Sequence, residues 1–162
     1  MADLEGFIDR LDYPVYVVTT AAAGEQAGCL VGFASQCSIE PVRFMIWLSR
    51  ANRTLRVARA ATHLAVHLLG REQRALAELF GGESGERIDK FARVPWASGS
   101  GDVPVLADAP AWFVGRIETL VDGGDHVGFL LDPVADGEPG EREGALLRLS
   151  DAIDIEPGHP VG

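Results

Sequence analysis

RFMIWLSRANRTLRVARAA, residues 43–61, passes from an apolar run directly into an arginine-rich segment. Residues 43–49 carry apolar side chains at both alternating positions, which predicts a central strand covered on both faces. From about Asn52 onward the pattern becomes helical, and Asn52 or Thr54 is a suitable residue to cap the helix start. The stretch therefore predicts a buried strand, a short turn and a helix.

The remainder of the chain is also dominated by predicted strands. Strands are expected over 13–20, 28–41, 63–69, 111–122 and 126–136, with a last short strand within 145–155. Helices are expected over 4–11 and 71–82, with a short one over 87–92. The turn GGD makes 111–122 and 126–136 a hairpin. We expect an ordered excursion over 84–110 and a mobile loop over 137–144. The fold class is mainly β: an antiparallel barrel with short decorating α-helices.

Composition excludes several classes of partner. The 162 residues are 47% hydrophobic and 23% charged, with 24 acidic against 14 basic residues and a net charge of −10. Such a chain repels nucleic acid and anionic membrane surfaces, so we expect neither as a partner. The start MADLEGFIDR has no basic segment followed by an apolar one, which predicts no secretory signal and a cytoplasmic location.

In so acidic a chain, four arginines within ten residues need an explanation. Arg50, Arg53, Arg56 and Arg59 surround the predicted helix start. Free N–H groups and the helix dipole make that start a site for an anion such as phosphate, with arginine forks as further donors. The alternative is a capped helix whose arginines pair with the protein's many acids.

The predicted strand 28–41 is unusually rich in small and polar residues. They are Gly32, Ala34, Ser35, Gln36 and Ser38. Small side chains let backbone groups reach the edge of a flat heterocycle, and a flat ring beside a phosphate site describes flavin mononucleotide (FMN). The alternative is a strand kinked at Gly32 to close the barrel.

Several segments in order resemble the flavin reductase-like proteins, which bind FMN in a split β-barrel. The resemblance runs from about Tyr13 to Val134. Its carriers are VYVVTT, GCLVGFASQCSIEP, LSRANRT, HLAVHLLGREQRALAELFGG, KFARVPW and GDHVG. The resemblance implies one FMN-binding domain over 1–162, a split β-barrel that is antiparallel and Greek-key-like. The chain departs from the family where Leu30, Gly32, Phe33 and Ala34 replace threonine and serine, which removes hydroxyl donors to the flavin.

The resemblance also implies the site residues. Against the flavin ring it puts Val31, Gly32, Phe33, Ala34, Ser35 and Gln36. At the ribityl chain and phosphate it puts Ser49, Arg50, Asn52, Arg53 and Thr54. His126 matches the family's histidine near the flavin or nicotinamide and is the candidate catalytic residue. No metal is implied.

The activity implied is hydride transfer from NADH or NADPH to FMN, with FAD as the alternative flavin. A homodimer is expected, and a separate monooxygenase is the expected recipient of reduced flavin. Two alternatives stay open. One is a barrel that binds flavin or haem without turnover, as a carrier or sensor, and the other is a deazaflavin-dependent relative.

Other reactive residues have simpler interpretations. His63 and His67 sit four apart on a predicted strand, roughly 13 Å from each other, too far to share a metal ion. Cys29 and Cys37 are interpreted as free structural thiols. Asp125 and His126 lack the GxSxG elbow of a hydrolase. Trp96 is the tryptophan most suited to meet a cofactor or a partner subunit.

Overall fold

The computed structural model describes residues 1–82, 89–138 and 144–155. In these ranges strands dominate, as predicted. They are β1 Tyr16–Ala22, β2 Glu25–Val31, β3 Ala34–Ile39, β4 Val42–Ser49, β5 His63–Leu68, β6 Trp96–Ser98, β7 Pro104–Leu106, β8 Trp112–Asp122 and β9 His126–Gly137. The helices are α1 Glu5–Ile8, α2 Arg53–Ala60, α3 Arg74–Gly82 and α4 Leu149–Ala152, with short 3-10 helices η1 Lys90–Ala92 and η2 Ser100–Asp102.

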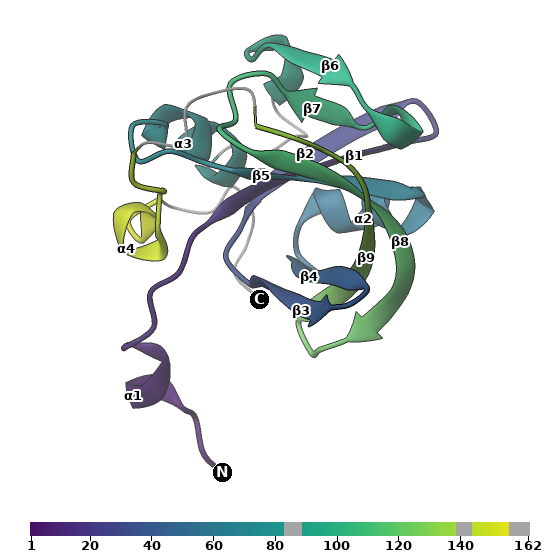
Figure 1. Cartoon of the computed structure of the whole chain (residues 1–162). Helices are drawn as coiled ribbons and strands as arrows, with labels where there is room; N and C mark the ends of the chain where they lie inside the picture. The colour runs from purple at the N-terminus through teal and green to yellow at the C-terminus, as the bar shows by residue number, and fades with distance from the viewer. Residues whose placement is uncertain (83–88, 139–143, 156–162) are drawn as a thin grey trace.

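Seven strands form one antiparallel sheet in the order β2-β1-β5-β8-β9-β4-β3. The register of β8 against β9 shifts after Val114 and again after Ile117, and such bulges bend a sheet. Figure 1 shows β8 and β9 curving so that β3 and β4 lie beneath β1, β2 and β5. The predicted antiparallel split barrel with short decorating helices and the predicted β8–β9 hairpin are confirmed.

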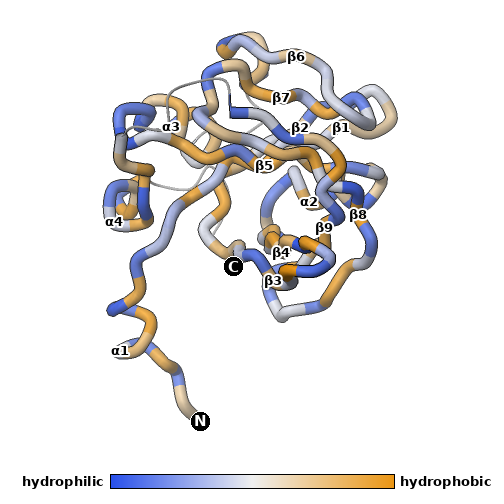
Figure 2. Tube along the Cα trace, in the orientation of Figure 1, coloured by the Kyte–Doolittle hydropathy of each residue, from blue (hydrophilic) through white to orange (hydrophobic). Residues whose placement is uncertain are grey.

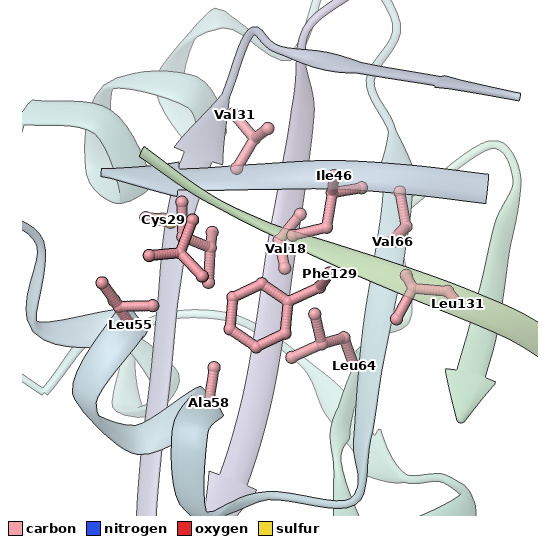
Figure 3. Close-up of a cluster of buried hydrophobic side chains, with 12 residues drawn as sticks. Val18, Cys29, Val31, Ile46, Leu55, Ala58, Leu64, Val66, Phe129 and Leu131 are labelled. Carbon is pink, nitrogen blue, oxygen red and sulfur yellow. The ribbon is translucent and has the colours of Figure 1, made fainter. Parts of the chain in front are cut away.

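The barrel interior is filled from several strands and closed at one end by α2. Figure 3 shows Leu55 and Ala58 of α2 packed with Phe129 of β9 and Leu64 of β5. Phe129 and Leu64 are fully buried. In Figure 2 hydrophobic residues gather along β4 and β5, which lie inside the sheet order. The predicted strand 43–49 corresponds to β4, which pairs with β9 on one side and with β3 on the other.

The predicted strand 28–41 is wrong, because two strands occupy this segment. The turn before it is shorter than expected: Ala23 and Gly24 both have positive φ, 52° and 79°, and they close a two-residue hairpin that lets β2 begin at Glu25. Pairing with β1 then stops after Val31. Gly32 and Phe33 carry the chain from β2 to β3, at the opposite edge of the sheet. The break is the split of the barrel.

The predicted last strand over 145–155 is also wrong. Only single bridges occur there, Gly70 with Leu146 and Pro14 with Arg148, and α4 follows. The Asp151 carboxylate accepts a hydrogen bond from the Arg148 amide, which favours a helical turn over an extended strand. The predicted loop 137–144 falls mostly on 139–143, and the predicted short helix 87–92 begins on 87–88. Both segments lie outside the described residues; the rest of the helix forms η1.

The predicted excursion contains a small sheet of β6 and β7 that covers the outer face of β5 and β8. Val103 and Val105 pack there on Ala65 and Val114. His67 of β5 ties this layer down: its Nδ1–H donates to the Val17 carbonyl at 2.8 Å, and its Nε2 accepts from the Leu106 amide at 3.0 Å. Both ring nitrogens are used, and burial lowers the pKa of His67 to about 4. His67 is therefore a neutral structural residue.

Candidate functional site

A cavity of about 610 Å³ opens at the split between β2 and β3. Segments distant in sequence meet there: the β2–β3 break, the end of β4, the start of α2, the β8–β9 turn and the α4 region. The lining residues are Tyr13, Cys29, Leu30, Val31, Gly32, Phe33, Trp47, Leu48, Ser49, Asn52, Phe80, Gly81, Asp125, His126, Leu149, Ala152 and Ile155. A cavity of this size is typical of a site for a small molecule or cofactor.

The break supplies the first wall. Of the segment 31–36 expected against the ring, Val31, Gly32 and Phe33 line the cavity, whereas Ala34, Ser35 and Gln36 belong to β3 outside its lining. A Cβ built at Gly32 would meet the Tyr13 ring at an ordinary 3.5 Å, so the chain's own packing does not require glycine. The missing side chain leaves backbone accessible to a ligand.

The β4–α2 turn supplies polar groups. Ser49 and Asn52 line the cavity. The Asn52 side-chain oxygen accepts from the Thr54 amide at 2.9 Å and so caps α2. Within the described ranges no protein group accepts a hydrogen bond from the Asn52 amide nitrogen. This donor is therefore available to a ligand.

The arginines of this turn point elsewhere. Arg50 donates to Asp122 at 2.8 Å and to the Gly124 carbonyl at 2.7 Å. Arg53 donates to Glu25 at 3.0 Å, and Arg56 binds the same carboxylate at 3.2 Å. Hydrogen bonds and charge from Arg56, and then the charge of Arg53, lower the pKa of Glu25. Neither Arg50 nor Arg53 lines the cavity.

Thr54 is buried within the start of α2, with 1% of its surface exposed, and does not line the cavity. Its amide is occupied by the Asn52 cap. Arg50, Arg53 and Arg56 therefore pair with acidic residues, as the alternative interpretation of the arginine-rich segment expects. Ser49 and Asn52 line the cavity.

His126 begins β9 and faces the cavity beside Phe33. Its Nδ1 lies 2.7 Å from an Asp125 carboxylate oxygen, and its ring centre lies 4.9 Å from that of Phe33, tilted by 51°. Because a carboxylate only accepts, Nδ1 carries a hydrogen, and in the neutral tautomer of the ring Nε2 is then an acceptor. Nε2 has no protein partner in the part of the chain that the structure describes.

Several lining residues were missed from the sequence. Asp125 is one of them. Side chains of adjacent residues point apart on an extended chain, so Asp125 was not expected to contact His126. It lies in the turn before β9, where its carboxylate reaches the His126 ring. The apolar wall from Leu149, Ala152 and Ile155 was also missed, since these residues were expected in a strand. The adjacent DH pair was the only sequence signal for Asp125, and no local pattern indicated the apolar wall.

Two remaining candidates are placed as follows. Cys29 is 3% exposed and lines the cavity; burial raises its pKa to about 11, so it is a neutral thiol. Trp96 donates its indole N–H to the Phe91 carbonyl at 3.1 Å and packs edge-on against Phe91. Trp96 is 39% exposed as a residue and lies outside the cavity lining.

Comparison with known proteins gives one consistent family. The model of the flavin reductase like domain matches residues 8–151. An FMN reductase (NADH) RutF 2 of Rhizobium rhizogenes is 30% identical over 126 residues, covering 78% of this chain and 72% of the relative. The NADH:FAD oxidoreductase SgcE6 of Streptomyces globisporus is 25% identical, with a TM-score of 0.78 and 91% of each chain covered.

A third relative is the stachydrine N-demethylase reductase subunit Stc3 of Rhizobium meliloti, 29% identical over 114 residues and 68% of this chain. The chain spans only 48% of that relative's length, and 36% of the length of a probable flavin reductase from the same organism. Among the described residues, no helix is both long and apolar enough to span a membrane.

Proposed function

The chain belongs to the flavin reductase-like domain family, and on that premise we propose that it transfers a hydride from NADH or NADPH to FMN. Relatives bear the names FMN reductase (NADH) and NADH:FMN oxidoreductase. One observation carries the proposal: a single cavity gathers the β2–β3 break, the β4–α2 turn and His126, three segments far apart in sequence. The family resemblance implied cofactor contacts for residues of each segment, among them Gly32, Asn52 and His126.

The residues present fit a flavin. Gly32 offers accessible backbone, and the cavity's aromatic and aliphatic walls suit the apolar end of a fused ring. Ser49 and Asn52 offer donors for the polar chain and phosphate. The roles of Ala34, Ser35, Gln36 and Thr54 in binding stay predictions. Arg50 and Arg53 would reach a phosphate only by leaving Asp122 and Glu25.

When bound, the flavin accepts a hydride from the nicotinamide. The protein's own task is to hold two flat rings face to face and exclude water. Asp125 fixes His126 with Nε2 as an acceptor, which suits a hydrogen bond from a carboxamide N–H of the nicotinamide. His126 would then be the residue that orients the second substrate.

Wider features of the proposal rest on the relatives' names. FAD is the alternative flavin, because one structural relative is an NADH:FAD oxidoreductase. A monooxygenase as recipient of reduced flavin is supported by the reductase component of a flavin-dependent trigonelline monooxygenase. A homodimer, one domain over 1–162 and a cytoplasmic location stay predictions from the sequence.

One observation favours a second candidate, a flavin carrier without turnover. The Phe33 ring lies on His126, where it would stand between the histidine and an incoming nicotinamide. Phe33 also occupies a position where the family has a hydroxyl residue. Binding without reduction is the outcome expected if Phe33 keeps this place.

The deciding experiment is an anaerobic visible spectrum of the protein with FMN, before and after addition of NADH or NADPH. Loss of the flavin band faster than in a protein-free control supports the reductase and identifies the preferred nicotinamide. Binding without loss of the band supports the carrier. No binding of FMN or FAD contradicts both candidates.

A further inference from the structure

The barrel has two ends, and within residues 1–82, 89–138 and 144–155 a helix closes only one of them. Leu55 and Ala58 of α2 close the end at which β1 and β4 finish and β5 begins. At the opposite end, where β1 and β4 begin and β5 finishes, a second cavity of about 300 Å³ opens. It shares no lining residue with the cavity at the split.

Aromatic rings form the wall of this second cavity. Tyr16, Phe44, Trp112 and Phe113 line it. The Phe44 ring lies edge-on to both neighbours, with centroids 5.9 Å from Tyr16 and 5.3 Å from Phe113. The buried side chain of Val66 contributes to the lining from the barrel interior. Four aromatic side chains from three strands, β1, β4 and β8, thus converge on one cavity.

One carboxylate belongs to the same lining. Asp136 of β9 pairs in register with Phe113 of β8, which puts its carboxylate at the aromatic wall. In the described part of the chain Asp136 has no hydrogen-bond or ion-pair partner. Asp132, on the same strand, is instead neutralised by Arg43 and Arg116 at 3.1 and 2.9 Å. The cavity therefore retains a net negative charge.

The Tyr16 hydroxyl is also unused by the protein within the described residues. Burial raises its pKa, so the ring stays neutral and its hydroxyl can bind a ligand. Electron-rich ring faces attract a cation, a nearby carboxylate adds to that attraction, and the chain's overall charge of −10 favours approach of a positive ligand.

We propose that this cavity, which we call the aromatic end pocket, is a second binding site for a small organic ammonium cation such as a trimethylammonium group. A metal ion would need several oxygen or sulfur ligands, whereas the lining offers one carboxylate and one phenol. A neutral apolar ligand would make no use of the exposed Asp136 carboxylate at the rim. The ammonium cation satisfies both the rings and the carboxylate.

The test is calorimetric titration of the flavin-free protein with choline and with its neutral isostere 3,3-dimethylbutan-1-ol, at equal ionic strength. Choline should bind about tenfold more tightly, because only the cation is attracted to the rings and to Asp136. Equal affinities, or no binding of choline, would overturn the proposal. Flavin and nicotinamide are absent, so the result is separate from that for the reductase.

Two variants locate the binding. Asp136→Asn should weaken choline about fivefold and leave the neutral isostere unchanged. Asp9→Asn, which removes the same charge from the residue that follows α1, serves as the control and should bind choline like the unaltered protein. Phe44→Leu keeps most of the volume but removes a ring, and should also weaken choline. If Asp136→Asn and Asp9→Asn behave alike, the pocket does not recognise the cation.

Discussion

Two histidines, one in the barrel wall and one in the β8–β9 turn, show how hydrogen bonds separate scaffold from site. His67 uses both ring nitrogens within the protein and is fully buried. His126 uses one nitrogen, on Asp125, and leaves the other toward a cavity. Residue type and strand context are similar in the two cases. What distinguishes them is whether the fold has already supplied every partner.

The largest expected effect is a loss of folding stability at acidic pH, which tests the structural role of His67. Burial lowers the pKa of folded His67 from its usual 6.5 to about 4, so only the unfolded chain takes up this proton between those values. The contribution is complete above pH 6.5 and is lost as the pH falls toward 4. We expect about 2 kcal/mol of unfolding free energy to be lost between pH 7 and pH 5. Denaturant titration at both values measures it.

His67→Gln is the matched control, since glutamine keeps a donor and an acceptor without titrating in this range. The variant should be less stable at pH 7, because its geometry differs, but its stability should change much less between pH 7 and pH 5. An equally steep loss in the variant would mean that other groups cause the acid effect.

The site histidine should show the opposite pattern. His126→Asn removes the Nε2 acceptor and should slow flavin reduction by NADH about tenfold, with little change in melting temperature. Asp125→Asn keeps the imidazole but no longer requires the hydrogen on Nδ1, and should give part of the same loss. Stopped-flow reduction rates check both. A large fall in melting temperature for His126→Asn would place this residue with His67 in the scaffold.

Asn52 lies between the two classes, because it caps α2 and also faces the cavity. Asn52→Ala should cost about 1 kcal/mol of stability through loss of the cap. It should also weaken FMN severalfold through loss of the amide donor. Asn52→Ser is the control: it keeps a capping oxygen and should restore stability more than affinity. Fluorescence titration with FMN and thermal melts separate the two effects.

These contrasts also explain what could be predicted from the sequence. The strands β4, β5, β8 and β9 follow from runs of apolar and β-branched residues, which is local information. The break at Gly32 and Phe33 could not be located, because a glycine within a strand pattern fits a bend as well as a change of sheet edge. The predicted strand over 145–155 was wrong for a related reason. LLRL alternates like a strand, but the Asp151 contact with the Arg148 amide favours the helical turn.

Part of the candidate site could be predicted from local sequence patterns, and part could not. Ser49, Asn52 and His126 carry polar groups next to chain turns, and turns were visible. The partners of the arginines were not visible, since Glu25 and Asp122 lie 28 and 72 residues away from Arg53 and Arg50. Pairing across such distances depends on strand register, which the local pattern does not contain.

The smallest expected effect is that of Glu25→Gln. This substitution shows whether Arg53 has a structural role or binds the FMN phosphate. If Arg53 is scaffold, Glu25→Gln should leave FMN affinity unchanged and lower stability slightly, most visibly at neutral pH, where the carboxylate is charged. If Arg53 is held in reserve for a phosphate, the same change should free it and raise FMN affinity about twofold to threefold. Asp122→Asn makes the parallel test for Arg50. Since riboflavin lacks the phosphate, its affinity should not change in either variant. A gain for riboflavin equal to that for FMN would show that the carboxylate repels the whole ligand and that neither arginine binds the phosphate.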